Sequence, residues 1–244
     1  MLSVVIPAYN ESKNITLTVE SIYQALNSLG LEHEILVVND HSVDDTEKVL
    51  NELSQSISTL RYVNNVNKGG FGNAIRYGLG LFKGDYVAIM MADLSDSPQD
   101  LISFYKLAID KNLDAVFGSR FIRGGVVKDY PKHKYLLNRF FNTLVRYLFG
   151  SDYNDFTNAF KLYKKETIDG LKPFLAPHFN LTLELPLKVL VRGFSFEVLP
   201  NSWRNRQFGT SNLKIKEMGS RYFFILFYCL IEKHFSRGDY SKQV

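Results

Sequence analysis

Two carboxylates, Asp93 and Asp96, directly follow the apolar run 86–91. A short and nearly continuous apolar run is typical of a strand that is covered on both faces. Carboxylates are hard oxygen ligands that suit Mg²⁺ or Mn²⁺, and such an ion can bridge a diphosphate. Pro98 then favours the first turn of a helix, so a turn or a helix cap is an equally good interpretation of the two residues taken alone.

Two further carboxylates follow expected strands elsewhere in the chain. Glu11 lies after the apolar segment 2–6, and Asp40 lies after the segment 34–39. Strands of one parallel sheet end at the same edge, where α/β sheets bind ligands, so we expect these side chains to converge with Asp93. A carboxylate in the position of Asp40 can accept hydrogen bonds from a nucleobase or from ribose hydroxyls.

Alternating strands and helices must position these residues. Through about residue 119 the chain alternates between short apolar segments and amphipathic ones. The alternation predicts an α/β fold, with a mostly parallel sheet, right-handed crossovers and helices on both faces. Strands are expected at 2–6, 34–39, 61–63, 86–91 and 114–118, and helices at about 12–29, 44–53, 73–82 and 98–110.

The second half of the chain departs from this alternation. Helices are expected at 132–149, 180–191 and 215–235, strands at 160–163 and 195–199, and a basic polar loop at 203–211. The segments 132–149 and 222–235 are apolar nearly all round, which is typical of buried helices or a homodimer interface and equally of a platform on a membrane surface. We predict a sheet domain over 1–212 and a helical C-terminal extension over 213–244.

The composition restricts the class of protein. A 244-residue chain that is 45% hydrophobic can bury a sizeable core, and a net charge of +4 is too small to indicate nucleic acid as a partner. The single cysteine, Cys229, excludes an internal disulfide framework. The chain begins like a strand and not like a secretory signal, and its longest apolar run, 222–231, is about half of a membrane-spanning helix. We expect a cytoplasmic protein, with at most peripheral contact to a membrane.

Three motifs in order resemble the inverting family 2 glycosyltransferases with the GT-A fold. They are Ile6–Glu11 (IPAYNE), Val38–Thr46 (VNDHSVDDT) and Met91–Pro98 (MADLSDSP). Within that family the chain is most similar to the polyprenyl-phosphate branch, which includes the dolichol-phosphate mannose synthases. Later motifs of this branch resemble Gly118–Arg120, Asp155–Lys161 and Arg204–Ser211. The resemblance covers about residues 2–212 and implies a Rossmann-like, nucleotide-sugar-binding sheet.

The resemblance implies a nucleoside diphosphate sugar as donor and Mg²⁺ or Mn²⁺ as cofactor. It places the metal at Asp93 with Asp96, and the nucleotide at Pro7, Tyr9, Glu11, Asp40, Lys68 and Ala92. The family usually has an Asp-x-Asp at the metal site, and here Met91 stands in place of the first acid. A thioether is a poor ligand for a hard cation. Either the remaining carboxylates and the diphosphate hold the ion, or the chain is a catalytically silent nucleotide-sugar-binding protein.

The nature of the acceptor determines which residues do the remaining chemistry. A lipid phosphate is already largely a dianion at neutral pH, and it needs cations. The candidates to bind it are Arg120, Arg139, Arg204 and Arg206, together with Ser211. A hydroxyl acceptor on a glycan needs a general base, for which Asp155 is the candidate. The resemblance favours the lipid phosphate, with Arg120 and Arg204 steadying it beside Asp93.

Overall fold

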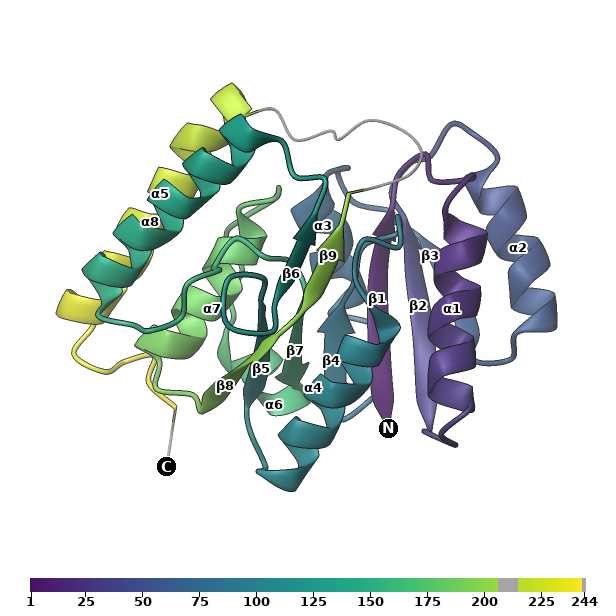
Figure 1. Cartoon of the computed structure of the whole chain (residues 1–244), viewed down its shortest axis with the longest axis horizontal. Coiled ribbons are helices and arrows are strands. Elements are labelled where there is room, and N and C mark those ends of the chain that lie inside the picture. The colour runs from purple at the N-terminus through teal and green to yellow at the C-terminus, as the bar shows by residue number, and fades with distance from the viewer. Residues whose placement is uncertain (206–214, 243–244) are drawn as a thin grey trace.

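A seven-stranded sheet runs through the middle of the molecule and carries helices on both faces (Figure 1). The computed structural model describes residues 1–205 and 215–242 of the chain. The strands lie in the order β3-β2-β1-β4-β7-β5-β8, and β7 runs antiparallel to β4 and β5, whereas the other neighbours are parallel. A separate two-stranded ribbon pairs β6 with β9. The predicted α/β fold with a mostly parallel sheet is therefore confirmed.

Most elements lie within a few residues of their predicted positions. The order is β1 (Leu2–Ala8), α1 (Ile15–Asn27), β2 (His33–Asn39), α2 (Thr46–Ser56), β3 (Leu60–Asn64), α3 (Phe71–Gly78), β4 (Tyr86–Ile89), α4 (Pro98–Asp110), β5 (Ala115–Ser119), β6 (Val126–Lys128), α5 (Lys132–Phe149), β7 (Lys161–Lys164), α6 (Lys165–Gly170), α7 (Leu181–Val191), β8 (Phe196–Pro200), β9 (Ser202–Arg204) and α8 (Ile215–Phe235). The sequence did not predict β6 or α6. Strand β9 also replaces the beginning of the loop expected at 203–211, because it pairs with β6.

The register of the sheet brings the strand ends together. Ala8 pairs with Asn39 where β1 and β2 end, and Val5 pairs with Ile89 where β4 ends. Beyond β4 the chain stays beside β1, since the N–H of Met90 donates to the carbonyl of Val5 (3.1 Å). The three predicted acidic positions therefore leave the sheet at one edge.

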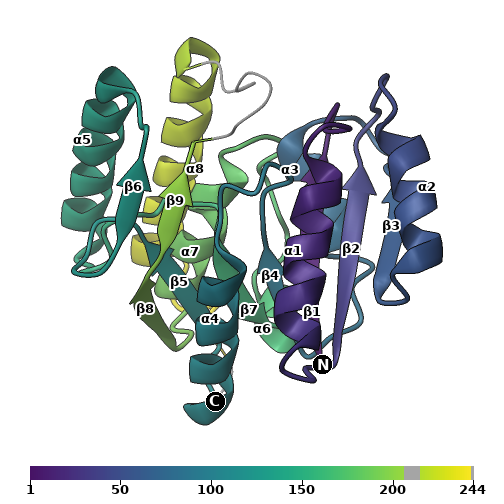
Figure 2. The same ribbon diagram turned by 45° about the vertical axis from the view of Figure 1, so that its right-hand side comes forward.

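Alternate residues of the buried strands pack into two cores, one on each face of the sheet. In β1, Val4 and Ile6 belong to the core formed with α1, α2 and α4, and Val5 belongs to the core formed with α3, α7 and α8. Figure 2 shows α1 and α4 in front of the sheet. Burial on both faces explains why β1 and β2 have continuous apolar sequences instead of alternating ones.

The last helix packs into the second core. Ile225, Leu226 and Cys229 of α8 are at most 1% exposed. Arg192, just after α7, donates from Nε and Nη2 to the carboxylate oxygens of Glu232 on α8 (2.6 and 3.0 Å), and both side chains are buried. This ion pair fixes α8 against α7. The boundary predicted between residues 212 and 213 lies outside the described residues and stays a prediction.

Helices α5 and α8 lie side by side at one end of the molecule (Figure 1, left). Near their middle the ring of Phe141 meets the ring of Tyr222 edge-on, with centroids 5.5 Å apart. Near their ends the Nζ of Lys233 donates to the carbonyl of Phe149 (2.9 Å). The two helices therefore run in the same direction along their length.

Candidate functional site

Asp40 follows β2 and is almost fully buried. Its Oδ1 accepts a hydrogen bond from Nδ2 of Asn65 (2.7 Å), and its Oδ2 accepts one from the backbone N–H of Gly70 (2.8 Å). Gly70 precedes α3 and has a φ of 133°, which favours glycine. Asp40 thereby fixes the start of α3 at the sheet edge, and its carboxylate oxygens retain lone pairs for a further donor.

Hydrogen bonds join the loops that follow β1 and β2. The N–H of Asn10 donates to Oγ of Ser42 (3.0 Å), and its Oδ1 accepts from the N–H of Val43 (2.8 Å). The N–H of Glu11 donates to Oγ1 of Thr46 (2.9 Å). These three bonds join the two loops at this part of the sheet edge.

The other residues predicted to bind a nucleotide differ in exposure. Tyr9 and Lys68 are exposed, whereas Pro7 is buried within β1. Glu11 is partly buried, and its Oε2 accepts a hydrogen bond from Nδ2 of Asn14 (2.7 Å). Tyr9 and Lys68 are thus the most accessible of these four predicted residues.

Asp93 and Asp96 lie in a tight loop between β4 and α4, where they are 9% and 3% exposed. The N–H of Ser95 donates to Oδ1 of Asp93 (3.2 Å), and the N–H of Met91 donates to Oδ2 of Asp96 (3.3 Å). Leu94 has a φ of 53°, a left-handed conformation that turns the chain between the two acids. Burial, with the neighbouring charge of Asp93, raises the pKa of Asp96 to about 7.

Ala92 precedes this loop and is buried. Its carbonyl accepts a hydrogen bond from Oγ1 of Thr18 in α1 (2.8 Å). This bond anchors the acidic loop to α1, and the contact of Ala92 with a nucleotide stays a prediction.

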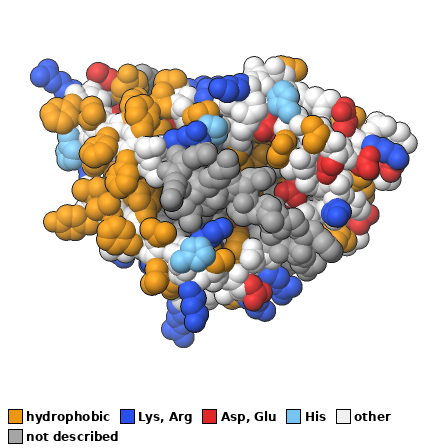
Figure 3. Space-filling view, turned by 90° about the horizontal axis from the view of Figure 1, so that it is seen from above, with side chains coloured by type: hydrophobic (Ala, Val, Ile, Leu, Met, Phe, Trp, Pro, Cys, Tyr) orange, Lys and Arg blue, Asp and Glu red, His pale blue; other side chains and the backbone are white. Residues whose placement is uncertain are grey.

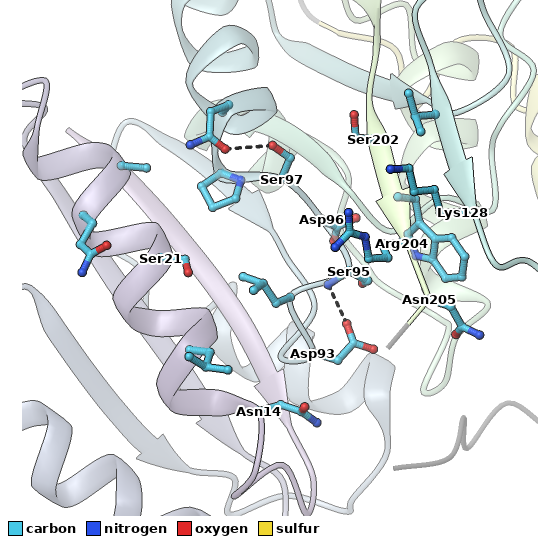
Figure 4. Close-up of a pocket in the computed structure, with 18 residues that line it drawn as sticks. Asn14, Ser21, Asp93, Ser95, Asp96, Ser97, Lys128, Ser202, Arg204 and Asn205 are labelled. Carbon is cyan, nitrogen blue, oxygen red and sulfur yellow. Dashed lines mark hydrogen bonds between the residues drawn. The ribbon is translucent and has the colours of Figure 1, made fainter. Parts of the chain in front are cut away.

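A pocket of about 770 Å³ opens over the acidic loop (Figure 4). Its walls come from α1, from residues 93–99, and from β6 and β9. Figure 4 shows Arg204 beside Ser95 and Asp96, across the pocket from α1. The backbone N–H of Arg204 donates to the carbonyl of Ser95 (3.0 Å), and Lys128 of β6 adds a second positive charge to the same wall. Carboxylates opposite cations suit an anionic ligand that is bound together with a metal ion.

The acidic loop offers at most two carboxylates to a metal ion. Within residues 1–205 and 215–242, no group of three His, Cys, Asp or Glu side chains is placed to hold one. Mg²⁺ commonly takes one or two carboxylates and completes its shell with water and phosphate oxygens. Asp93 and Asp96 fit such an ion in company with a bound diphosphate, and Met91 contributes no hard ligand.

Arg120 and Asp155 form a buried ion pair close to this pocket. Nε and Nη2 of Arg120 donate to the two carboxylate oxygens of Asp155 (2.8 and 2.7 Å), and the backbone N–H of Arg120 adds a third bond (3.1 Å). Burial acts to lower the pKa of Arg120, but the charge and hydrogen bonds of Asp155 outweigh it, and the net shift is upward. Arg120 therefore stays charged at any physiological pH.

This ion pair affects whether Asp155 can act as the general base that was predicted for a hydroxyl acceptor. Asp155 is 0% exposed, and both of its oxygens accept hydrogen bonds from Arg120. As it lies here, the carboxylate is not open to an acceptor hydroxyl, which is a requirement for a general base. The contacts instead give Asp155 the task of positioning Arg120.

Lys161 holds the loop that carries Asp155, and the sequence did not reveal this role. The side chain is 1% exposed, and its Nζ donates to the carbonyls of Phe156, Asn158 and Thr182. Burial lowers the pKa of Lys161 to about 7, although Asp155 acts in the opposite direction. A buried ammonium group with three carbonyl partners ties this loop to α7.

A second pocket, of about 540 Å³, lies where Arg120 meets α5. Arg139 and Tyr135 of α5 line it together with Arg120 and Phe121. The guanidinium carbon of Arg139 lies 4.2 Å from the ring centre of Phe121, and its Nη1 donates to the carbonyl of Asn154 (2.9 Å). Two arginines beside aromatic rings suit a phosphate, because a guanidinium group presents several N–H donors to its oxygens.

Trp203 lies between the two pockets and was not singled out from the sequence. It lines the first pocket, and its ring centre is 5.9 Å from the guanidinium carbon of Arg120, which lines the second. The ring of Tyr130 packs on Trp203 with centroids 5.1 Å apart. The available signal was the position of this tryptophan, the only one in the chain, directly before Arg204.

The arginines predicted to bind the acceptor do not all line one pocket. Arg204 lines the first pocket, Arg139 lines the second, and Arg120 reaches Trp203 from the second. Two other predicted acceptor residues, Arg206 and Ser211, lie outside the described residues.

Comparisons with known proteins identify the family of this chain. The profile of glycosyl transferase family 2 matches residues 3–171. The polyprenol monophosphomannose synthase of Mycolicibacterium smegmatis is 30% identical over 216 residues, which is 86% of this chain and 80% of the relative. The dolichol-phosphate mannosyltransferase of Pyrococcus furiosus is 29% identical over 219 residues, 88% of this chain and 60% of that protein.

A similar fold occurs among solved structures. The glucosyl-3-phosphoglycerate synthase of Mycobacterium tuberculosis, crystallised with Mn²⁺, uridine diphosphate and phosphoglyceric acid, superposes with a TM-score of 0.70. The match covers 94% of this chain and 78% of that one at 21% identity, so it supports the fold alone.

Proposed function

The chain belongs to glycosyl transferase family 2, and from this premise we propose that it is an inverting glycosyltransferase that moves a sugar from a nucleoside diphosphate sugar to a polyprenyl phosphate. Both relatives are named for joining mannose to a polyprenol or dolichol phosphate. The observation that carries the proposal is the pair of pockets that strand β6 helps to line, one with Asp93 and Asp96 and the other with Arg120 and Arg139.

The donor occupies the sheet edge and the first pocket. Asp40 accepts hydrogen bonds from the base or the ribose, and Tyr9 and Lys68 border the nucleotide. The diphosphate lies over the acidic loop, where Asp93 and Asp96 would hold a Mg²⁺ or Mn²⁺ ion. When bound, this ion neutralises the charge of the leaving diphosphate.

The acceptor phosphate occupies the second pocket, between Arg120 and Arg139. One of its oxygens attacks the anomeric carbon from the side opposite the diphosphate. The new C–O bond forms as the bond to the diphosphate breaks, the nucleoside diphosphate leaves with the bonding electrons, and the configuration inverts. Arg204 faces the leaving group from the wall of the first pocket and offsets the negative charge that it gains.

The environment of Asp155 supports a phosphate acceptor over a hydroxyl one. A phosphate monoester is mostly a dianion at neutral pH, since its second pKa is about 6, and it needs no base. A hydroxyl acceptor does need one, and the candidate, Asp155, is buried and bonded to Arg120. The cations of the second pocket serve a phosphate directly.

A polyprenyl acceptor remains in a bilayer, so the enzyme must act at a membrane surface. Among the described residues, no helix is both long enough and apolar enough to cross a membrane. We expect peripheral contact at the cytoplasmic face.

The test is transfer by the purified protein in detergent. Nucleotide sugars carrying uridine, guanosine or cytidine are each incubated with Mg²⁺ or Mn²⁺ and a polyprenyl phosphate, and glycolipid is measured. The dephosphorylated polyprenol and a soluble glycan serve as matched acceptors. The proposal predicts product with the phosphate alone and none after addition of EDTA.

Other results would assign a different function. Transfer to the polyprenol or the glycan in preference to the phosphate would indicate a hydroxyl acceptor. Nucleotide binding that is indifferent to metal, with no transfer and no donor hydrolysis, would indicate the catalytically silent protein that Met91 suggests.

A further inference from the structure

Helices α5 and α8 together expose a broad apolar face. On α5, Leu136, Phe140 and Tyr147 are 68%, 72% and 85% exposed, and their spacing places them along one side of the helix. On α8, Phe227 and Ile231 are 59% and 60% exposed, with the same helical spacing. Figure 3 shows hydrophobic side chains gathered over the end of the molecule where these two helices lie. This α5–α8 face is too extensive to be a scatter of single surface residues.

The charges around the α5–α8 face are mainly positive. Helix α5 has no Asp or Glu, and Lys132 and Lys134 lie in its first turn. On α8 the carboxylate of Glu232 is buried against Arg192, whereas Lys233 is exposed. Figure 3 shows Lys and Arg side chains at the margin of the apolar area. Aromatic side chains inside a basic rim match the acyl boundary and the headgroups of an anionic bilayer.

The same helix connects this face to the second pocket. Tyr135 and Arg139 line the pocket, and their immediate neighbours Leu136 and Phe140 belong to the exposed face. A lipid whose chain stays in the acyl layer beside α5 can therefore present its phosphate to Arg139 without leaving the bilayer. The face and the pocket lie within one helical turn of each other.

We propose that the α5–α8 face binds the surface of an anionic lipid bilayer and turns the Arg120–Arg139 pocket toward its headgroups. This orientation rests on the proposed function, whereas the binding itself does not. A second copy of the chain fits the face less well, because a symmetric dimer built on it would bring Lys132, Lys134 and Lys233 of both copies into one interface.

The test measures co-sedimentation of the whole chain with lipid vesicles, without donor or acceptor. Vesicles contain phosphatidylcholine alone or with added phosphatidylserine, at low and high salt. The double substitution Phe140→Glu with Phe227→Glu, called the face variant, places two negative charges on the α5–α8 face. The matched control, Leu29→Glu with Ile109→Glu, changes two side chains that are each 50% exposed in the turn after α1 and on α4.

The wild type and the control should bind phosphatidylserine vesicles, and binding should weaken in salt. The face variant should bind at least about tenfold more weakly, because two aromatic anchors are lost and two like charges are added. In detergent-free assays it should transfer sugar to a short, water-soluble prenyl phosphate as the wild type does, but poorly to a long acceptor embedded in vesicles.

Three results would overturn the proposal. The first is wild-type protein that binds neither kind of vesicle. The second is a face variant that binds vesicles as well as the wild type does. The third is a wild type that forms a dimer in analytical ultracentrifugation while the face variant is a monomer. The last result would assign the face to a second copy. Vesicle binding that depends on the face, with no transfer to either acceptor, would keep this proposal and refute the proposed function instead.

Discussion

Replacing Asp155 by Asn should cost the protein more in stability than in chemistry. The carboxylate is 0% exposed and its partner Arg120 only 8%, and three hydrogen bonds join them. Removing one member of a buried ion pair costs roughly 3–5 kcal/mol, because the other charge is left without compensation. For a chain of this size that corresponds to a fall in Tm of about 10 °C.

A double-mutant cycle measures the pair directly. Asp155→Asn, Arg120→Met and the double variant are unfolded in urea and followed by circular dichroism. The double variant should be less destabilised than the sum of the single variants by about 2 kcal/mol or more, since it contains no unpaired buried charge. Asp152→Asn, which changes a fully exposed acid in the same loop, serves as control.

Turnover below the melting temperature then separates positioning from proton transfer. With a lipid phosphate acceptor, Asp155→Asn should keep its affinity for nucleotide and raise the acceptor KM, because Arg120 loses its fixed orientation. The reasoning is refuted if Asp155→Asn unfolds within about 0.5 kcal/mol of the wild type. It is equally refuted if kcat falls by a factor of about 10² to 10⁴ at unchanged acceptor KM, which is the behaviour of a general base.

Three further substitutions test the acidic loop and the start of α3. Asp93→Asn should lower kcat by about 10²-fold or more while calorimetry shows unchanged metal-free nucleotide binding, and the exposed Asp110→Asn should change neither. Folded Asp96 has a pKa raised to about 7, so the metal-free protein should lose stability as pH rises from about 4 through 7, by up to about 4 kcal/mol. Asp96→Asn should flatten this slope in thermal melts at several pH values, and an equally steep slope would contradict the assignment. Gly72→Ala should destabilise the protein by about 2 kcal/mol or more and weaken donor binding, because its Cβ would lie 2.6 Å from backbone atoms of residues 176–178. The control, Gly80→Ala, should be nearly neutral, because its Cβ would meet nothing closer than 3.4 Å.

Local sequence patterns were sufficient to predict which carboxylates lie at the edge of the sheet. Apolar runs identify β1, β2 and β4 because these strands are buried on both faces, and parallel strands must end together. The arrival of Asp40 and Asp93 at one edge followed from those two facts. The roles assigned to these side chains remain predictions.

Short strands in polar sequence could not be predicted. β6 and β9 have three residues each, are partly exposed, and are paired across 76 positions of the chain. Neither has an apolar period of its own, and each exists because the other lies beside it. The wall that β6 and β9 contribute to the first pocket, with Trp203, was therefore missed.

The sequence also did not predict which charged residues pair when they lie far apart in the chain. The sequence indicated that Arg120 and Asp155 belong to the site, but it gave them separate tasks, one for a phosphate and one for a proton. Their mutual contact depends on β5 and β7 lying side by side, which places the ends of distant segments together. The burial of Lys161 depends on the same packing. The sequence did not predict it, because charged side chains are rarely found inside a protein.

The ion pair between Arg192 and Glu232 has a consequence for synthesis. The carboxylate that neutralises Arg192 comes 40 residues later in the chain. While a ribosome is still adding the last turns of α8, the guanidinium group has no counter-charge, and enclosing it would be costly. The helical side of the molecule that contains α7 must therefore close late, after Glu232 has emerged, whereas the strands at the amino-terminal half can assemble during translation.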